Sequence, residues 1–374
     1  MLHPFDDFPV HQSSAPLLHV TSDAPGVYDR YFYNGHDAKG ELFFAVAFGV
    51  YPNKQVMDAT FCVSIGGVQH SVRASRHADR DRTNLEVGAI RIDVVRPMLE
   101  HRIVVDNRFG LSADITWRAT SALLEEPTFK HLENGRPLMD YTRMTQFGEW
   151  SGWIELDGNR INLGDAGPIT GCRDRSWGVR NSSKQFVGPK KPPQFCWFWA
   201  PTTFDDSYAH AAVNDYANGR SWHRSGAVTA RVAHGSTSID SVLNESAVDR
   251  CTAVKIEPVW QQGTRWVESA TITLERWRAE PLVLTYTPLS RFFMQGIGYT
   301  HATWGHGEWH GEFEETRDQF VQADANPADP TMIHLQNLCR VEGNGKVGVG
   351  VLEHLVIGPH EPSGFTSILD GARG

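Results

Sequence analysis

The stretch Gly171-Cys-Arg-Asp-Arg-Ser-Trp-Gly-Val-Arg180 says most about how this chain folds and where its chemistry lies. It gathers charged and aromatic side chains into ten residues, which is hard to explain as ordinary surface. In a β-strand, alternation would place Arg173, Arg175 and Trp177 on one face and Asp174 on the other. One face could then support the sheet while the other lines a cavity.

Outward from this stretch, short alternating segments bounded by Gly, Asn, Asp or Pro recur along the whole chain, and helical periodicity is scarce. This rhythm predicts an all-β protein. Asp157-Gly158 and Gly343-Asn344-Gly345 are expected hairpin turns because their residues tolerate positive φ. The expected strands lie at residues 42–50, 59–63, 88–95, 101–105, 111–119, 153–156, 196–199, 227–233, 270–276 and 346–357.

The length of 374 residues indicates two domains, at ~150 residues per domain. The pattern of the second half repeats that of the first, which fits two antiparallel β-barrels or sandwiches in tandem. The predicted division is an N-terminal arm over residues 1–22, a first β domain over 23–185, a second over 186–361 and a tail over 362–374. The boundary falls in the polar, proline-rich residues 181–193.

The opening stretch resembles the Asp-(His/Arg)-(Ser/Asn)-Trp-Gly signature of the AttH-type, lipocalin-like two-domain proteins. That superfamily includes hydroxyneurosporene synthase, a carotenoid hydratase. The resemblance covers about residues 20–365 and implies two lipocalin-like domains; the family mixes hydratases, cyclases and members of unknown activity. The further stretches that agree are Tyr51-Pro-Asn53 with Asp58, Ala74-Ser-Arg76, Asp140-Tyr-Thr-Arg-Met-Thr-Gln-Phe-Gly148, Gly298-Tyr-Thr-His301, Trp304-Gly-His-Gly307 and Gly350-Val-Leu-Glu-His-Leu-Val-Ile-Gly-Pro-His360.

Composition narrows the classes of partner. Hydrophobic residues make up 40% of the chain and aromatic residues 11%, with 12 Trp, which suggests an aromatic-lined cavity as well as a core. Aromatic filling of the barrels alone is an equally good explanation. A net charge of -9 with scattered basic residues argues against nucleic acid as a partner.

The five cysteines are widely spaced and form no Cys-x-x-Cys pair, which favours reduced, buried thiols over disulfides or a zinc site. The N-terminus lacks a basic region followed by an apolar run, and no stretch approaches the ~20 apolar residues of a membrane span. We therefore expect a cytoplasmic protein without a membrane span. The sequence leaves open whether it forms a homodimer.

Nucleotide-binding and hydrolase signatures are missing. The chain has no Gly-x-Gly-x-x-Gly after a strand, no phosphate-cradling Gly-x-x-x-x-Gly-Lys-Ser/Thr and no Gly-x-Ser-x-Gly elbow. We expect neither a cofactor nor a metal.

Asp174 is the leading candidate for chemistry. A carboxyl group in an aromatic, poorly hydrated pocket can have its pKa raised and act as a general acid. The indole face of Trp177 would then stabilise a developing carbocation. The competing interpretation is an ion pair of Asp174 with Arg173, Arg175 or Arg180 at the domain junction, which would lower its pKa.

A second candidate is the run Gly298-Tyr-Thr-His-Ala-Thr-Trp-Gly-His-Gly-Glu-Trp-His-Gly311. The spacing of its histidines could suggest a metal site, but the glycines argue against the helix that would align them. On a strand, Tyr299 and His301 share a side and are predicted as catalytic partners of Asp174. Trp304 and His306 are predicted to contact substrate. A structural, glycine-rich strand pair is the alternative.

Three residues of 140–150 complete the predicted site. Tyr141, Arg143 and Gln146 are expected to line the same cavity, with the planar fork of Arg143 anchoring a polar end of the substrate. An outward-facing strand edge is at least as good an explanation. Trp199 is expected in the aromatic wall.

These expectations combine into a cofactor-independent acid-base enzyme that acts on an apolar isoprenoid, terpenoid or aromatic small molecule in a cavity at the domain junction. The reaction would be hydration or dehydration of an alkene, cyclisation or isomerisation. The alternative is a non-catalytic intracellular carrier of a lipid, steroid or aromatic ligand, because lipocalin-like barrels readily hold such molecules.

Overall fold

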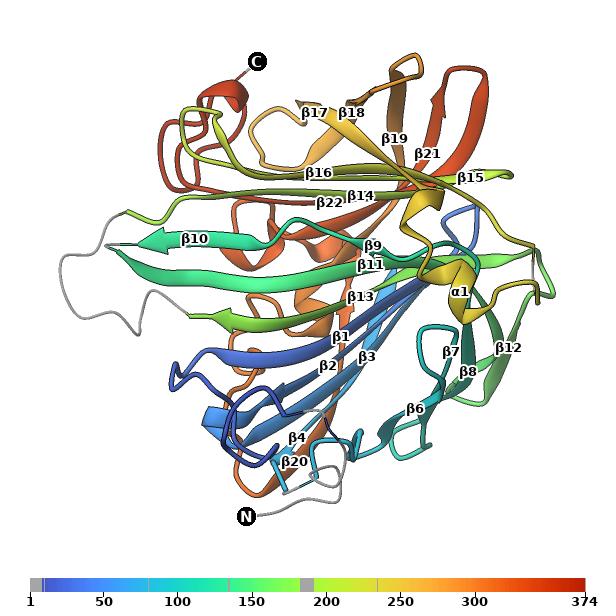
Figure 1. The fold of residues 1–374 in the computed structure, drawn as a ribbon, viewed down its shortest axis with the longest axis vertical. Coiled ribbons are helices and arrows are strands. Elements are labelled where there is room, and N and C mark those ends of the chain that lie inside the picture. The colour runs from blue at the N-terminus through green and yellow to red at the C-terminus, as the bar shows by residue number, and fades with distance from the viewer. Residues whose placement is uncertain are drawn as a thin grey trace.

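The computed structural model describes residues 9, 11–79, 81–133, 135–181, 192–233 and 235–373. Strands dominate these residues, so the predicted all-β class is confirmed. They form an open, curled sheet of 14 strands and a closed barrel of eight strands, which lie against each other (Figure 1). The two antiparallel β units expected in tandem are therefore one open, curled sheet and one closed barrel.

The open sheet has β1 and β13 at its centre, paired antiparallel. In spatial order its strands are β20 (Phe313–Val321), β4 (Val68–His77), β3 (Val56–Ile65), β2 (Leu42–Tyr51), β1 (Val27–His36), β13 (Ile169–Arg180), β11 (Arg136–Leu156), β8 (Leu111–Ala119), β7 (Glu100–Val105), β6 (Ile90–Arg96) and β5 (Glu86–Val87). The short strands β9 (Leu124–Glu125), β10 (Phe129–Glu133) and β12 (Asn159–Leu163) pair with the long β11.

The barrel closes by pairing its first strand with its last. Its strands are β14 (Phe195–Thr203), β15 (Ser207–Asp215), β16 (Ser221–Ala230), β17 (Val248–Trp260), β18 (Val267–Arg276), β19 (Leu282–Phe293), β21 (Leu335–Gly343) and β22 (Lys346–Ile357). The helical elements are the single α-helical turn α1 (Ile239–Val242) and the 3-10 turns η2 (Pro52–Lys54), η4 (Glu245–Ala247), η5 (Met294–Ile297), η6 (Gln322–Asp324), η7 (Pro330–Met332) and η8 (Glu361–Ser363). Within the described ranges, no helix has the length and apolar character needed to cross a membrane.

Strand β2 shows why the sheet must be covered on both faces. Its sequence Leu-Phe-Phe-Ala-Val-Ala-Phe-Gly-Val-Tyr is apolar almost throughout, and all ten residues are buried. Phe44 and Phe48 pack into the core inside the curled sheet, whereas Phe43 and Ala45 pack into a second core between sheet and barrel. A third core fills the barrel. A strand without a polar face is stable only in such a sandwich.

Strand β20 ties the two halves of the chain together. It follows η5 and the loop after it, yet it pairs with β4 at the edge of the first sheet, where Figure 1 shows it in orange beside blue strands. The segment at residues 313–321 therefore belongs to the first sheet by hydrogen bonding, although it lies within the predicted second domain. The predicted boundary at residues 185 and 186 lies outside the described residues, and the domain limits stay predictions.

Two local expectations meet different outcomes. Asp157 and Asn344 have positive φ and each precedes a glycine in the left-handed region, as the predicted hairpin turns require. The expected strand pair at residues 298–311 is wrong, because this segment is a loop between η5 and β20. Positive φ values recur along it, with 100° at Gly298, 56° at Thr300 and 65° at Gly307, and extended pairing cannot continue through such residues.

Candidate active site at the sheet and barrel junction

A cavity of about 180 Å³ lies where the open sheet meets the barrel. Strands β1, β11 and β13 supply one wall, strands β14, β15 and β22 the opposite wall, and η5 with the loop after it closes one end. The lining residues are Arg30, Phe32, Met139, Tyr141, Arg143, Asp174, Ser176, Arg180, Phe195, Trp197, Trp199, Asn214, Met294, Tyr299, His334, Glu353 and Leu355. The predicted cavity at the junction is thus present, and it is aromatic and strongly charged.

Asp174 faces this cavity from the middle of β13. No other described residue forms a hydrogen bond or an ion pair with its carboxyl group, so the ion pair that the sequence left open is not formed there. Burial raises the pKa of Asp174 to about 6, against the opposing effect of Arg143, Arg30 and Arg180. A carboxyl group in this state can hold and release a proton near neutral pH.

The neighbouring arginines of β13 have other partners. Arg173 donates two hydrogen bonds to Gln146 Oε1, at 3.1 Å from Nε and 2.9 Å from Nη2. Arg175 forms an ion pair with Asp29 of β1. Both side chains lie on the face opposite Asp174, as alternation along the strand predicts.

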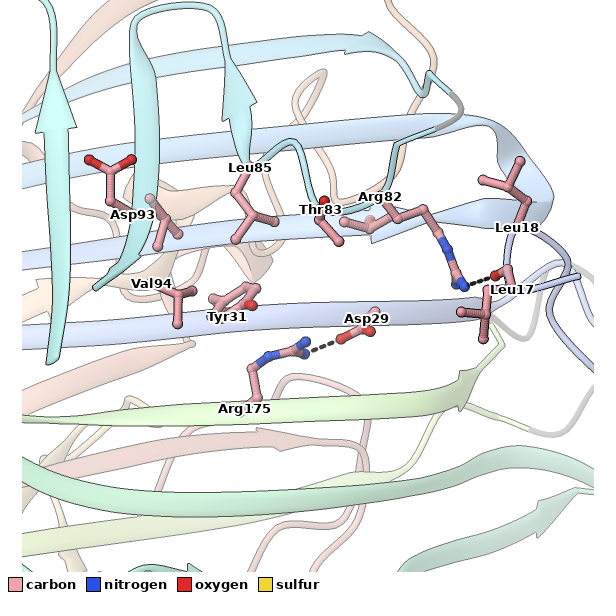
Figure 2. A pocket seen from close by; sticks show the side chains of 12 residues that line it. Leu17, Leu18, Asp29, Tyr31, Arg82, Thr83, Leu85, Asp93, Val94 and Arg175 are labelled. Carbon is pink, nitrogen blue, oxygen red and sulfur yellow. Dashed lines mark hydrogen bonds and ion pairs between the residues drawn. The ribbon is translucent and has the colours of Figure 1, made fainter. Parts of the chain in front are cut away.

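That opposite face borders a second cavity, of about 700 Å³, inside the curled sheet. Figure 2 shows Arg175 joined to Asp29 there, with Tyr31 beside them and Leu17 and Leu18 of the N-terminal arm at one end. Strand β13 therefore separates two cavities, and adjacent residues on it, such as Asp174 and Arg175, line different cavities.

Two of the predicted substrate contacts, Trp177 and Gln146, therefore do not line the junction cavity. Trp177 lies on the Arg175 face, where it is 44% exposed, and does not line the junction cavity. Gln146 lies on the same face and bonds Arg173 and, at 3.1 Å, the carbonyl of Met98. Alternation already excludes Trp177 from the Asp174 face, three positions away on the same strand.

Arg143 does line the cavity, but its charge is already matched by Glu126. Its Nε and Nη2 donate to the two carboxylate oxygens of Glu126 at 2.8 and 2.6 Å. Burial alone would raise the pKa of Glu126, but Arg143 and His210 lower it to about 2. The Arg143 guanidinium also lies over the rings of Phe129 and Trp197, at 4.6 and 4.7 Å. Arg143 thus contributes a fixed positive charge to the cavity wall, and its Nε and Nη2 are already bonded to Glu126 rather than free to bind a substrate anion.

Tyr299 reaches the cavity and is held there by Arg30. Arg30 Nη1 donates to the Tyr299 hydroxyl at 2.8 Å, and Arg30 Nη2 lies 2.9 Å from His306 Nε2. Burial and the charge of Arg30 hold the pKa of His306 well below its ordinary value, so this neutral ring accepts the hydrogen bond. Because the Tyr299 oxygen accepts from Arg30, its own proton is available to the cavity. His306 positions Arg30 and does not itself line the cavity.

His301 and Trp304 are not brought to the cavity. The backbone N–H of Trp304 donates to His301 Nδ1 at 3.0 Å, so His301 Nε2 carries the proton and donates to Asp318 at 3.2 Å. Trp304 stacks on His310 with ring centroids 4.0 Å apart. The three histidines of this loop thus have separate partners and do not form one cluster. The left-handed turns at Thr300 and Gly307 break the alternation on which the prediction depended.

Several residues of the site escaped the sequence analysis. Glu353 accepts from His334 at 2.8 Å, Gln336 at 2.7 Å and Trp197 at 3.0 Å. Burial would raise its pKa, but these donors lower it and keep the carboxylate ionised. A charged residue inside the apolar run Gly350-Val-Leu-Glu-His-Leu-Val is a signal that could have found it, as is Arg30 among the aromatic residues of β1. Glu126 carries no such signal.

Polar atoms without a partner among the described residues point into the same region. They are Arg30 Nε, Trp199 Nε1, Arg180 Nε, Asn214 Oδ1 and His334 Nδ1, and all five residues line the cavity. The Arg180 guanidinium donates to the Tyr28 hydroxyl at 3.3 Å and lies over the ring of Tyr141 at 4.6 Å. Buried polar groups normally find partners, so such a set is typical of a site that receives a polar ligand or water. The arrangement joins a carboxyl group with a raised pKa, two arginines without an ion pair among the described residues, and aromatic walls.

A model of a protein family described only as a family of unknown function, DUF8625, matches residues 2–366. The chain belongs to this family. No curated protein matches the chain by sequence.

Two solved structures share the fold. A provisionally assigned AttH protein from Nitrosomonas europaea superposes with a TM-score of 0.53 at 13% identity, over 88% of this chain and 92% of that chain. Kievitone hydratase from Nectria haematococca superposes with a TM-score of 0.51 at 13% identity, over 89% of this chain and 90% of that chain. The predicted AttH-type resemblance is thereby confirmed at the level of the fold.

Proposed function

We propose that this protein is a cofactor-independent acid-base enzyme that adds water to, removes water from, or rearranges a small unsaturated molecule in the junction cavity. The observation that carries the proposal is the Asp174 carboxyl group, which faces the cavity without a hydrogen-bonding partner in the described chain and has a pKa raised to about 6. That a fold relative is a hydratase by name agrees with this class of reaction.

In the hydration direction, Asp174 would transfer its proton to one carbon of a substrate double bond. Positive charge then develops on the other carbon, next to the π faces of Trp197 and Trp199. Water adds to that carbon, and its surplus proton returns to the Asp174 carboxylate, so one water is consumed and the acid is regenerated. In a cyclisation or isomerisation Asp174 would add its proton to one carbon, and the carboxylate would then take up a different proton from another carbon, so the acid is regenerated at constant mass.

The substrate class follows from the size and charge of the cavity. A cavity of about 180 Å³ is close to the ~150 Å³ that holds benzene in an apolar protein interior, so it fits one ring with a polar substituent better than a long isoprenoid chain. Arg30 and Arg180 form no ion pair with a described residue, and the Tyr299 proton is available. Of the classes expected from sequence, an aromatic molecule with an acidic hydroxyl or carboxylate fits best.

The carrier remains the second candidate because of the cavity of about 700 Å³ inside the curled sheet, which is larger and has Leu17, Leu85 and Val94 in its wall. A carrier would use that space for storage and return its ligand unchanged. The expected cytoplasmic location stays a prediction.

The test is incubation of a cell extract that contains both apolar and acidic aromatic compounds with the wild-type protein and with Asp174→Asn, followed by untargeted mass spectrometry. Asp140→Asn is the matched control, since Asp140 lies on the adjacent β11 but does not line the cavity. We expect a compound that gains or loses one water, or changes retention at constant mass, with wild type and Asp140→Asn only. A compound retained unchanged by all three proteins would overturn the enzyme and support the carrier.

A further inference from the structure

A second group of reactive side chains lies in the barrel, away from the junction cavity. Cys196, Asp215 and His360 offer one ligand atom each, and these atoms all lie within 4.8 Å of one another. Among the described residues, these three side chains form the one group of three or more His, Cys, Asp or Glu that lie close enough together to share a metal ion.

The barrel topology brings these residues together. Cys196 of β14 is the direct antiparallel partner of Asp215 at the end of β15, so the two side chains project on the same face. Cys196 is also paired with Val356 of β22, and His360 follows four residues later in the segment after that strand. Three strand ends therefore converge on one point.

Two of the three spacings match a tetrahedral metal site, and the third lies within 4.8 Å. Cys196 Sγ lies 3.6 Å from His360 Nε2, and His360 Nε2 lies 3.5 Å from Asp215 Oδ2. Zinc bonds of ~2.3 Å to sulfur and ~2.1 Å to nitrogen and oxygen, at tetrahedral angles, put neighbouring ligand atoms ~3.4–3.6 Å apart. A direct hydrogen bond from histidine to carboxylate would be shorter, at ~2.7–2.9 Å.

Hydrogen bonds with neighbouring serine hydroxyl groups orient Asp215 and His360 towards the cluster. Ser221 Oγ donates to Asp215 Oδ1 at 2.6 Å, which leaves Oδ2 directed at the cluster. Ser363 Oγ lies 2.8 Å from His360 Nδ1, so a proton on Nδ1 can bond the serine while the lone pair of Nε2 faces inward. Such partners behind the ligands are characteristic of metal sites.

Charge favours a divalent cation at this point. Cys196 is fully buried and Asp215 is mostly buried, with 15% of its side chain exposed. A thiolate, a carboxylate and a neutral imidazole together carry two negative charges, which one Zn²⁺ balances.

We propose that Cys196, Asp215 and His360 bind one zinc ion, with a water in the fourth position. Asp215 and His360 line a cavity of about 380 Å³ at the barrel mouth, which gives the ion a route of entry and the fourth ligand space. Binding displaces the thiol proton into solvent and forms the Zn–S bond without any change of oxidation state. The ion would fix the segment around η8 to the ends of β14 and β15.

The test uses the full-length protein, stripped with chelator under reducing conditions and titrated with Zn²⁺ by calorimetry, and with Co²⁺ by absorption spectroscopy. We expect one equivalent of Zn²⁺ to bind with a Kd of ~1 μM or tighter. Co²⁺ should show a sulfur-to-cobalt charge-transfer band together with the intense visible bands of a tetrahedral site. Zn²⁺ should also raise the Tm of wild type.

Cys196→Ser should abolish the charge-transfer band, and Asp215→Asn should weaken Zn²⁺ binding at least ~10-fold. Cys339→Ser is the matched control, because Cys339 is equally buried in the barrel but its thiol donates to the carbonyl of Asn337. If Cys196→Ser does not fold, the partly exposed Asp215→Asn variant decides. Absence of saturable binding, or binding that survives Asp215→Asn unchanged, would show a hydrogen-bonded cluster without metal and overturn the proposal.

Discussion

Arg30 and Tyr299 are joined by a hydrogen bond of 2.8 Å although 269 positions separate them in the chain. Arg30 comes from β1 of the open sheet, and Tyr299 from the loop that leads from the barrel towards β20. The bond therefore closes the junction cavity at the point where the second half of the chain crosses to the first sheet. Any movement of that loop would move the Tyr299 hydroxyl within the cavity that Asp174 also lines.

The first prediction concerns the stability of Asp174→Asn at different pH values. The pKa of Asp174 is raised from 3.8 to about 6, so between these values the native state holds a proton that the unfolded chain has lost. Its contribution to stability is therefore full below about pH 4 and is lost as the pH rises through about 6, with a total of about 3 kcal/mol. An Asn side chain at position 174 does not ionise, so its contribution to stability does not change with pH in this way.

Asp174→Asn should consequently be stabilised relative to wild type by up to about 3 kcal/mol more at pH 8 than at pH 4. Urea unfolding of both proteins at the two pH values measures this. Asp58, whose pKa burial also raises to about 6, is present in both proteins and cancels from the comparison. An equal difference at both pH values would mean that Asp174 titrates normally in the folded state.

The second prediction concerns the pH dependence of the proposed reaction. If protonated Asp174 is the acid, kcat/KM for the compound found in the extract should fall about tenfold per pH unit above about pH 6. Asp174→Asn should be inactive across the range. A rate that stays flat to pH 8 would remove Asp174 from the role of proton donor.

The third prediction concerns the ion pair of Arg143 and Glu126, whose side chains are 5% and 1% exposed. Arg143→Met leaves the Glu126 carboxylate buried without its cation, which should cost about 3–5 kcal/mol of unfolding free energy. Adding Glu126→Leu removes the stranded charge and should restore most of the loss. Urea unfolding of the two single variants and the double variant gives the coupling, and additive losses would contradict it.

The fourth prediction separates Tyr299 from His301, which the sequence placed together. Tyr299→Phe removes the hydroxyl that accepts from Arg30 and faces the cavity, so kcat should fall roughly 10²-fold with little change in Tm. His301→Asn should do the opposite and lower the Tm, because His301 links the Trp304 amide to Asp318. Equal losses of kcat in both variants would mean that His301 takes part in the reaction as Tyr299 does.

The fifth prediction concerns the aromatic wall. Trp197→Phe should weaken binding of an aromatic carboxylate to the junction cavity, since the Trp197 ring lines it and its Nε1 donates to Glu353. Trp177→Phe should leave that affinity unchanged, because Trp177 lies on the opposite face of β13. Calorimetry with the same ligand on both variants is sufficient, and a loss confined to Trp177→Phe would mean that the ligand binds on the opposite face of β13.

Much of the local structure could be read from the sequence, because it depends on residues close together in the chain. Alternation in residues 171–180 separates Asp174 from Arg173 and Arg175, as the two faces of β13 show. Positive φ at Asp157 and Asn344 follows from hairpin turns that few residues tolerate. The all-β class follows from the same kind of signal, whereas the AttH-type fold and the cavity at the junction were expected from the resemblance of several separate stretches to a known family.

Tertiary structure alone decided which side chains meet. Glu126 reaches Arg143 across the β9–β11 region, Tyr299 reaches Arg30 between the two halves, and Cys196 meets Asp215 and His360 at three strand ends. Such contacts are fixed by strand pairing and by the packing of sheet on barrel, neither of which leaves a local pattern in the chain. The same long-range packing excludes His301 and Trp304 from the cavity. The sequence alone thus determined most strands, the hairpin turns and the face of β13 on which Asp174 lies. The pairing of distant strands decided which side chains surround Asp174.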